Sequence, residues 1–363
     1  MDRLLKIGSS VLFLLLFIQI IRCEMKKNLP EFGVEICSPN NKYDVTPIYD
    51  TIKTLEGVAA GLPYGSSSGR WGDSGSTWTK QHGTPVGADI VYYSRYEDVF
   101  YRLNVDFPID TIKDYMERAY ARIDDANGET EEYKRLGRDH KSSNGKSYDS
   151  FSDLVFGFAP KGMVVVWLNF GITRIELGRY QAEILTDRAV IEKTRQKYLA
   201  KYRLSSDRYD EAAKEYFLED ASPAKWDNYR CRYHWRPIIS SENPDLKLIG
   251  FQSSYYNGEI ECMLRPWINH PVYKERAVPF EINIVWMTGK KDEEKKQAFL
   301  YFNWQKVNEV FQSSGDRIDM QVKISKENTL ELMVNDQSFV ADSIRVFDWS
   351  PSMLSGRMYK NVK

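Results

Sequence analysis

The sequence is poor in the residues from which metal and redox sites are built. Its 363 residues include four His and four Cys, and no CxxC pair or His-rich spacing occurs. A structural zinc site takes four such ligands at short spacings. The glycine patterns of Walker and dinucleotide-binding loops are missing too. The sequence therefore predicts no metal centre and no cofactor.

A surplus of charge of either sign is also lacking. The chain has 50 Lys+Arg against 51 Asp+Glu, a formal net charge of −1. Because a nucleic-acid binder neutralises phosphates with a basic surplus or a strongly basic face, no nucleic-acid partner is expected. With 28% charged and 42% hydrophobic residues, the chain is neither a polytopic membrane protein nor a disordered one. Its length suits about two domains of roughly 150 residues, or one domain with two lobes.

The long apolar run at the N-terminus indicates export. Arg3 and Lys6 precede the apolar run Ile7–Ile21, which is shorter than the ~20 residues of a transmembrane helix. We therefore predict a signal sequence at residues 1–22 and a periplasmic location. Cys23 follows as in a bacterial lipoprotein signal, although Arg22 departs from the small residue expected there. The chain is then held at the membrane either by a lipid on Cys23 or by an uncleaved signal anchor.

The cysteines of an exported protein can form disulfides. Cys231 and Cys262 both lie in strand-like runs of one β-rich stretch. A bridge between neighbouring strands is one interpretation of this placement. Two buried free thiols are the other, since Cys is among the most buried residue types.

The rest of the chain divides into a tether, a domain and a tail. Residues 23–45 are predicted to be a polar tether, residues 46–350 the folded domain and residues 351–363 a tail. A division of the domain into two lobes that meet near 221–228 is the alternative to a single body. Helical spacing of apolar residues predicts helices at Ile48–Ala60, at Ile109–Ala126 and from about 290 to 311. Short strands are predicted between them, and the Asn257-Gly258 pair signals a β-hairpin. The fold class expected is α+β, with mostly antiparallel sheets and segregated helices.

Two charged segments predict a helical hairpin within that fold. Asp187–Arg203 has six basic and two acidic residues, and Asp207–Asp220 has six acidic and two basic. Opposite charges on neighbouring helices attract modestly, by a few tenths of a kcal/mol per exposed pair. A solvated, mutually paired face is therefore the favoured interpretation, and a basic ligand patch is the alternative.

The loop 64–85, dense in Gly and Ser, contains two strings that resemble hydrolase motifs. Gly65–Gly69 matches G-x-S-x-G, and Gly72–Gly75 matches the core of a serine-protease nucleophile loop. The first motif needs a strand before it and a helix after it. The second needs a His base upstream, and the first His of the chain is His82. We therefore predict no enzymatic activity, with a serine hydrolase using Ser67 or Ser74 as a remote alternative.

The same loop carries aromatic and basic side chains of the kind that dominate binding hot spots. Tyr64, Arg70, Trp71 and Trp78 are accordingly the candidate partner-binding residues. In the alternative interpretation, Trp71 and Trp78 tuck into the core and hold the long loop in place.

Several strings spread over residues 55–350 resemble a known family. They are Leu62–Gly65, Trp71–Gly75, His82–Pro85, Gly157–Leu168, Glu176–Ala182, Tyr233–Pro237 and Tyr256–Glu259. Together they are similar to uncharacterised exported proteins of Gram-negative bacteria, many of them lipoproteins, which are grouped as a domain of unknown function. Genes of that family often lie beside type VI secretion phospholipase effectors.

The resemblance implies an immunity protein that binds and neutralises a secreted lipase-type effector in the periplasm. It transfers no catalytic residues, because the family has none established. An envelope protein that binds lipid or another small ligand, or that serves only structurally, is the alternative function.

Overall fold

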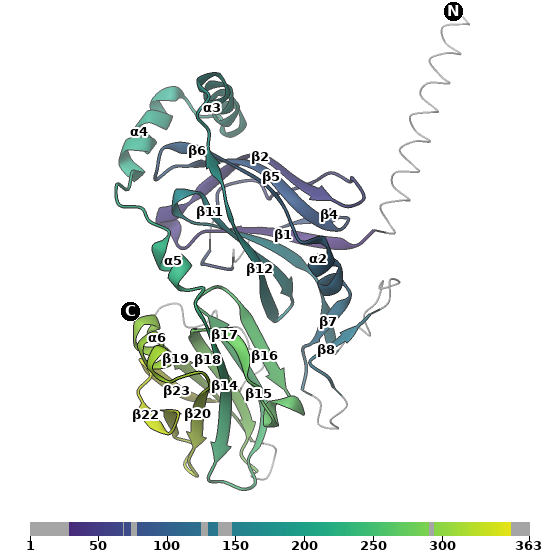
Figure 1. Cartoon of the computed structure of the whole chain (residues 1–363), viewed down its shortest axis with the longest axis vertical. Coiled ribbons are helices and arrows are strands. Elements are labelled where there is room, and N and C mark those ends of the chain that lie inside the picture. The colour runs from purple at the N-terminus through teal and green to yellow at the C-terminus, as the bar shows by residue number, and fades with distance from the viewer. Residues whose placement is uncertain are drawn as a thin grey trace, which may run out of the picture.

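The computed structural model of the chain describes residues 29–67, 69–73, 78–124, 130–136, 147–289 and 294–349 (Figure 1). Its architecture is mostly β, with 48% strand and 20% helix arranged around four sheets. The predicted α+β fold, with segregated helices and a charged helical hairpin, is therefore wrong. Sheets rather than helices cover most of the hydrophobic core.

A ten-stranded sheet runs through the whole molecule. Its strands, in spatial order, are β23 (Ser343–Asp348), β19 (Lys295–Tyr301), β18 (Pro279–Met287), β15 (Lys247–Tyr255), β16 (Ile260–Leu264), β12 (Thr173–Gln181), β11 (Met163–Phe170), β10 (Asp153–Phe158), β1 (Glu31–Cys37) and β4 (Trp78–His82). Its neighbours are antiparallel except for β1 and β10, which pair in parallel. At the centre, β12 and β16 are joined through the single residue pair Arg174↔Ile260.

Three smaller sheets complete the architecture. One contains β13 (Glu183–Ile184), β6 (Val99–Asp106), β5 (Pro85–Ser94), β2 (Val45–Thr54) and β3 (Ala60–Gly61). A second contains β17 (Lys274–Ala277), β14 (Arg232–Ser241), β20 (Ile318–Ile324), β21 (Leu330–Val334) and β22 (Gln337–Phe339). The third, which we call the β arm, contains β8 (Tyr133–Arg135), β7 (Arg118–Ala121) and β9 (Tyr148–Ser150).

Two separate hydrophobic cores divide the molecule into lobes. The largest core of the N-lobe, the described residues 29–221, runs from Phe32 to Ala221. The core of the C-lobe, the described residues 232–349, runs from Trp235 to Val334. Helix α5 (Ala224–Asn228) lies between the lobes, and the β arm extends from the N-lobe down beside the C-lobe (Figure 1).

The helices are short and lie at the edges of the sheets. They are α2 (Ile109–Met116), α3 (Arg188–Tyr202), α4 (Ser206–Tyr216), α5 and α6 (Trp304–Ser313). Helices α3 and α4 occupy the two charged segments and lie at the end of the N-lobe away from the C-lobe (Figure 1). The Asp187 side chain caps α3 by accepting from the backbone N–H groups of Ala189 and Val190.

The three longer predicted helices are wrong in whole or in part. Residues 48–54 belong to strand β2, the segment 109–126 is helical only to Met116 before β7, and the segment 290–311 contains β19 before α6. The predicted tether also differs, because residues 31–37 form β1, which lies inside the ten-stranded sheet. Val34 and Ile36 of that strand are fully buried.

Candidate binding site

The loop that connects β3 to β4, residues 62–77, carries three of the four candidate partner-binding residues, and Trp78 begins β4. We call it the β3–β4 loop. Its described residues, 62–67 and 69–73, extend from the end of α3 to the boundary between the two lobes. Tyr64 therefore lies apart from Arg70 and Trp71, and the candidates do not form one patch.

Tyr64 is the exposed member of the set, at the start of the β3–β4 loop. Its side chain is 67% exposed. Its hydroxyl donates to the Lys201 backbone carbonyl at the C-terminal end of α3 (3.2 Å), and its ring lies 5.2 Å from that of Tyr202. The Tyr202 hydroxyl donates to the Pro47 carbonyl at 3.2 Å. Tyr64 is thus an exposed aromatic residue whose ring and hydroxyl are held at the end of α3.

Ser66 and Ser67 attach the next part of the loop to strand β2. The Ser67 hydroxyl accepts from the Val45 backbone N–H at 2.9 Å, and the Ser67 N–H donates to the Val45 carbonyl at 2.8 Å. Ser67 is 4% exposed, so its hydroxyl is a buried turn contact rather than a nucleophile presented to solvent. Ser74 lies outside the described residues.

Trp71 packs inward. Its ring makes an edge contact with Trp167 at a centroid distance of 5.1 Å and lies 6.3 Å from Trp226. Among the described residues its indole Nε1 is buried without a hydrogen-bond partner. Trp71 therefore fastens the loop to the core, as the alternative interpretation of the sequence expected. Trp78 pairs through its backbone with Glu35 of β1, and its side chain lies outside the described atoms.

Arg70 lies near the C-lobe. Its backbone exchanges two hydrogen bonds of 2.8 Å with Asp73, and its guanidinium lies 3.7 Å from the Asp73 carboxylate. Burial raises the pKa of the Glu281 carboxyl in β18, and the positive charge of Arg70 partly opposes that rise. Arg70 therefore belongs to the boundary between the lobes.

The turn Asn257-Gly258, predicted as a hairpin signal, projects from the C-lobe into this boundary. The Trp167 indole N–H donates to the Asn257 carbonyl at 3.1 Å, and Arg174 Nη1 donates to the Gly258 carbonyl at 3.4 Å. Gly258 and Gly72 lie so close that a Cβ built on Gly72 would be 2.8 Å from the Gly258 Cα. We call this meeting of the β3–β4 loop, β11, β12 and the turn the lobe junction.

Carboxylates and guanidinium groups complete the lobe junction. The Glu259 side chain accepts from the Glu176 backbone N–H at 2.9 Å and pairs with Arg232 at 2.9 Å. Glu176 pairs with Arg230 at 2.7 Å and is 6% exposed at its side chain. The hydrogen bond from Glu176 to Glu259 joins β12 of the N-lobe to the turn of the C-lobe, and the Glu176–Arg230 pair joins β12 to the segment before β14. The Glu259–Arg232 pair lies within the C-lobe.

Arg174 is the most buried cation of the junction, at 8% exposure. Burial lowers the pKa of its guanidinium, and the nearby Asp73, Cys37 and Glu35 oppose that shift. Burial likewise raises the pKa of the Cys37 thiol to about 12. Arg174 is thus a buried cation whose charge is balanced by the acidic groups around it.

Four of the strings that carried the family resemblance meet at this junction. They are Trp71–Gly75, of which residues 71–73 are described, Gly157–Leu168, Glu176–Ala182 and Tyr256–Glu259. Sequence analysis did not bring them together, because their members are up to about 190 positions apart in the chain. The one shared signal in the sequence was glycine, which occurs in each of these four strings.

The two cysteines considered for a disulfide are free and lie apart in the fold. Cys231 is exposed just before β14, whereas Cys262 lies in β16 of the ten-stranded sheet. The bridge, one of the two interpretations, is absent from the structure. The other, two buried free thiols, is right that both are free, but Cys231 is exposed and Cys262 is only partly buried. Cys23, the lipidation candidate, lies outside the described residues.

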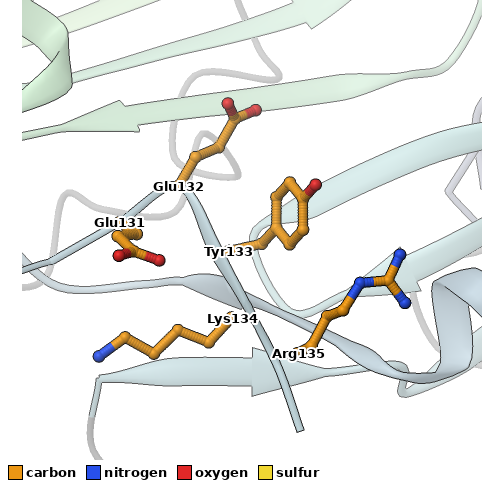
Figure 2. Close-up of a pocket in the computed structure, with 5 residues that line it drawn as sticks. All are labelled: Glu131, Glu132, Tyr133, Lys134 and Arg135. Atoms are coloured by element: carbon orange, nitrogen blue, oxygen red, sulfur yellow. The ribbon is translucent and has the colours of Figure 1, made fainter.

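The β arm borders a separate surface hollow. Figure 2 shows the five residues that line it, Glu131 to Arg135, around a volume of about 590 Å³. Glu132 leaves the strand toward the C-lobe, where its carboxylate pairs with Lys274 at 2.7 Å. Asp124, at the end of the arm, pairs with Arg265 of the C-lobe. The arm therefore makes a second attachment between the lobes.

The described part of the chain has neither a membrane-spanning helix nor a cluster of metal ligands. No helix in those ranges is long and apolar enough to cross a membrane. No three His, Cys, Asp or Glu side chains among the same residues come together as metal ligands.

The comparisons with known proteins found a family and no individual relative. A family model described as a protein of unknown function (DUF2931) matches residues 23–225. No curated protein and no solved structure matches the chain. The matched segment covers the N-lobe and ends inside α5, before the first strand of the C-lobe. Since it spans more than half of the 363 residues, the chain belongs to this family of proteins of unknown function.

Proposed function

We propose that this protein is a periplasmic immunity protein that binds and neutralises a lipase-type effector of type VI secretion. The proposal includes export through the N-terminal 22 residues and attachment to the membrane by the N-terminal segment. The resemblance described above supplies the partner class. Its action is stoichiometric binding, so no chemistry by its own residues is required.

The observation that carries the proposal is the exposed, fixed ring of Tyr64. A binding loop gains affinity when its aromatic anchors are ordered before the partner arrives, because less conformational entropy is then lost on association. Tyr64 meets both conditions, since 67% of the residue is exposed while its hydroxyl is held by the Lys201 carbonyl. Trp71, which is fastened into the core, is no longer a candidate contact residue.

The test is co-expression with the lipase-type effector encoded by the neighbouring gene, directed to the periplasm and scored by survival and by co-purification. Tyr64→Ala is expected to weaken the complex by about 2 kcal/mol, the size of a hot-spot truncation, with little loss of fold stability. Val340→Ala is the matched control, because Val340 is 78% exposed on the C-lobe. Survival without any detectable complex would contradict binding as the mode of protection.

Ser67→Ala separates this proposal from the hydrolase alternative. The substitution leaves the buried Val45 N–H without its side-chain acceptor, so a stability loss of about 1–3 kcal/mol is expected. Protection should persist at a temperature where the variant is folded. Loss of protection by a folded variant that still binds the effector would favour the enzyme.

A further inference from the structure

Three lysines form a stripe along helix α3. Lys193, Lys197 and Lys201 follow one another at intervals of four residues, which places them on the same side of a helix. The stripe is roughly 12 Å long at a rise of 1.5 Å per residue. Like charges at this spacing destabilise a helix, so the arrangement invites a functional explanation.

The acidic helix α4 does not neutralise this stripe. The ion pair that joins the two helices is between Arg195 and Asp210, at 2.7 Å. Within the described residues, none of the three lysine Nζ atoms has a carboxylate within 4 Å. The sequence favoured a face on which the two helices pair their charges. Among the described residues that pairing is limited to the Arg195–Asp210 contact, so we treat the three lysines as a basic patch, the alternative interpretation.

Aromatic rings hold two of the three lysines, Lys197 and Lys201, in place. The Lys197 Nζ lies 3.4 Å from the ring centroid of Tyr49. The Lys201 Nζ lies 5.8 Å from the Tyr64 ring and 5.7 Å from the Tyr202 ring, and it donates to the Pro47 carbonyl at 3.2 Å. Cation–π contacts of this kind fix the direction of a flexible ammonium group while leaving it charged. Together these residues define the α3 patch: Tyr49, Tyr64, Lys193, Lys197, Lys201 and Tyr202.

We propose that the α3 patch is the docking surface for an acidic segment of a protein partner. The inference rests on the proposed function and names the surface through which it operates. Three cations in a row, without a carboxylate partner among the described residues, are complementary to a row of carboxylates. Complementary charge both steers association and excludes wrong partners. Exposed Tyr64, within the same patch, supplies the aromatic contact that anchors a protein interface.

The test compares two charge-reversed variants of the full-length protein. The stripe variant is Lys193→Glu, Lys197→Glu and Lys201→Glu. The matched control is Lys225→Glu, Lys247→Glu and Lys326→Glu, three exposed lysines elsewhere that likewise have no carboxylate within 4 Å among the described residues. Both sets change the net charge equally. Lysine and glutamate have similar helix propensities, and circular dichroism checks that α3 persists.

The probe is the purified lipase-type effector encoded by the neighbouring gene, titrated at about 50 mM and about 300 mM salt. The stripe variant is expected to bind at least about tenfold more weakly than the wild type at low salt, with a flatter salt dependence. The control is expected to stay within about threefold. If charge reversal disturbs the fold, the Gln series at the same three positions should show a smaller loss in the same direction.

Several outcomes are distinguishable. A wild-type protein that neither binds nor protects would overturn the proposed function itself. A wild-type complex that the stripe variant retains would overturn only the docking surface. Binding of the wild type to vesicles containing phosphatidylglycerol, lost in the stripe variant, would assign the patch to anionic lipid and would also overturn the proposal.

Discussion

At the scale of single residues, Gly258 sets how closely the two lobes approach. Its φ is +92°, and a Cβ built on it would lie 2.9 Å from the Trp167 ring and 3.2 Å from the Gly72 Cα. A side chain there meets both a strained backbone conformation and a filled space. The neighbouring Gly72 has φ +81° and faces Gly258 directly, so the two glycines form one contact.

Gly258→Ala is therefore expected to lower the free energy of unfolding by about 2–4 kcal/mol, the sum of backbone strain and overpacking. Gly315→Ala is its control, because Gly315 has φ +82° and nothing lies within 4 Å of its would-be Cβ. The control should cost only about 1 kcal/mol. Urea denaturation measures both, and equal losses would show that the junction is not tightly packed.

The three described cysteines give a second residue-scale prediction. Burial raises the pKa values of the Cys37 and Cys262 thiols to about 12. Because alkylation requires the thiolate, these two thiols should react slowly near neutral pH. Cys231 is exposed, so it alone should be alkylated rapidly in native, unreduced protein near neutral pH. Cys37 and Cys262 should react after denaturation without any reductant. If Cys231 and Cys262 both stayed unlabelled until reduction, a disulfide would be present after all.

Glu261 makes stability depend on pH. Burial raises its pKa, but Arg276, whose side chain is 3% exposed, outweighs that effect and leaves the pKa below the usual range. In Glu261→Gln the Arg276 charge is left buried, so a loss of about 3 kcal/mol is expected at neutral pH.

The sign of the effect follows from the lowered pKa. Between the folded pKa and the ordinary value of about 4.3, the unfolded chain binds more protons, so the contribution of Glu261 to stability disappears as the pH falls. The stability difference between wild type and Glu261→Gln should therefore shrink below about pH 4. Denaturation midpoints from pH 3 to 7 measure this, with exposed Glu331→Gln as the control. A difference that stayed constant with pH would contradict the assignment.

At the scale of elements, the sequence identified strands better than helices. Ile48 and Ile52 were assigned to a helix, but a spacing of four also keeps two residues on one face of a strand. Both are buried in β2, whereas Leu55, the next member of the supposed helical stripe, is 51% exposed. Three β-branched Thr residues in β2 favour a strand. Gly57, which follows β2, suits the turn to β3.

The hairpin at Asn257-Gly258 and the strands around it could be predicted, because turn chemistry is local. The lobe junction could not, since its contacts join residues far apart in sequence. Tyr64, a candidate from the sequence, is exposed, and its role in binding stays a prediction. Trp71 was chosen by the same argument, yet its ring packs on Trp167. Composition alone does not distinguish an aromatic residue that anchors a loop from one that contacts a partner.

The β3–β4 loop therefore has one structural end and one exposed end. Trp71→Ala should reduce the free energy of unfolding by about 3 kcal/mol, because it removes a large ring from a packed aromatic cluster. Trp71→Phe should lose about half as much or less. Tyr64→Ala should change it by less than about 1 kcal/mol. Thermal and urea unfolding measure the three variants, and a stable Trp71→Ala would return Trp71 to the exposed surface.

At the scale of the whole molecule, two lobes with separate cores behave as one body only if their boundary is strong. The ten-stranded sheet crosses that boundary through a single residue pair, Arg174↔Ile260. Side chains must therefore supply most of the connection. The Glu176 and Glu259 carboxylates do so on one side, and the β arm does so on the other through Asp124 and Glu132.

This arrangement predicts that the junction carboxylates govern cooperativity as well as stability. In the wild type, tryptophan fluorescence and far-ultraviolet circular dichroism should give the same denaturant midpoint, as a single cooperative unit requires. The double variant Glu176→Gln, Glu259→Gln keeps side-chain size but removes the charges that face Arg230 and Arg232. Both carboxylates are largely buried, at 6% and 12% side-chain exposure, so their loss should cost about 2–5 kcal/mol.

The loss should fall on the boundary, because the hydrogen bonds and ion pairs of both substituted side chains lie at the junction. The double variant is therefore expected to unfold in two steps, with the fluorescence and dichroism midpoints separated. The exposed pair variant Glu309→Gln, Glu331→Gln, which changes the charge equally within the C-lobe, should unfold in one step near the wild-type midpoint. Coincident transitions in the junction variant, even with lowered stability, would mean that backbone pairing and the β arm suffice to couple the lobes. In that case the lobe junction would contribute to stability without being needed for the two lobes to unfold in one step.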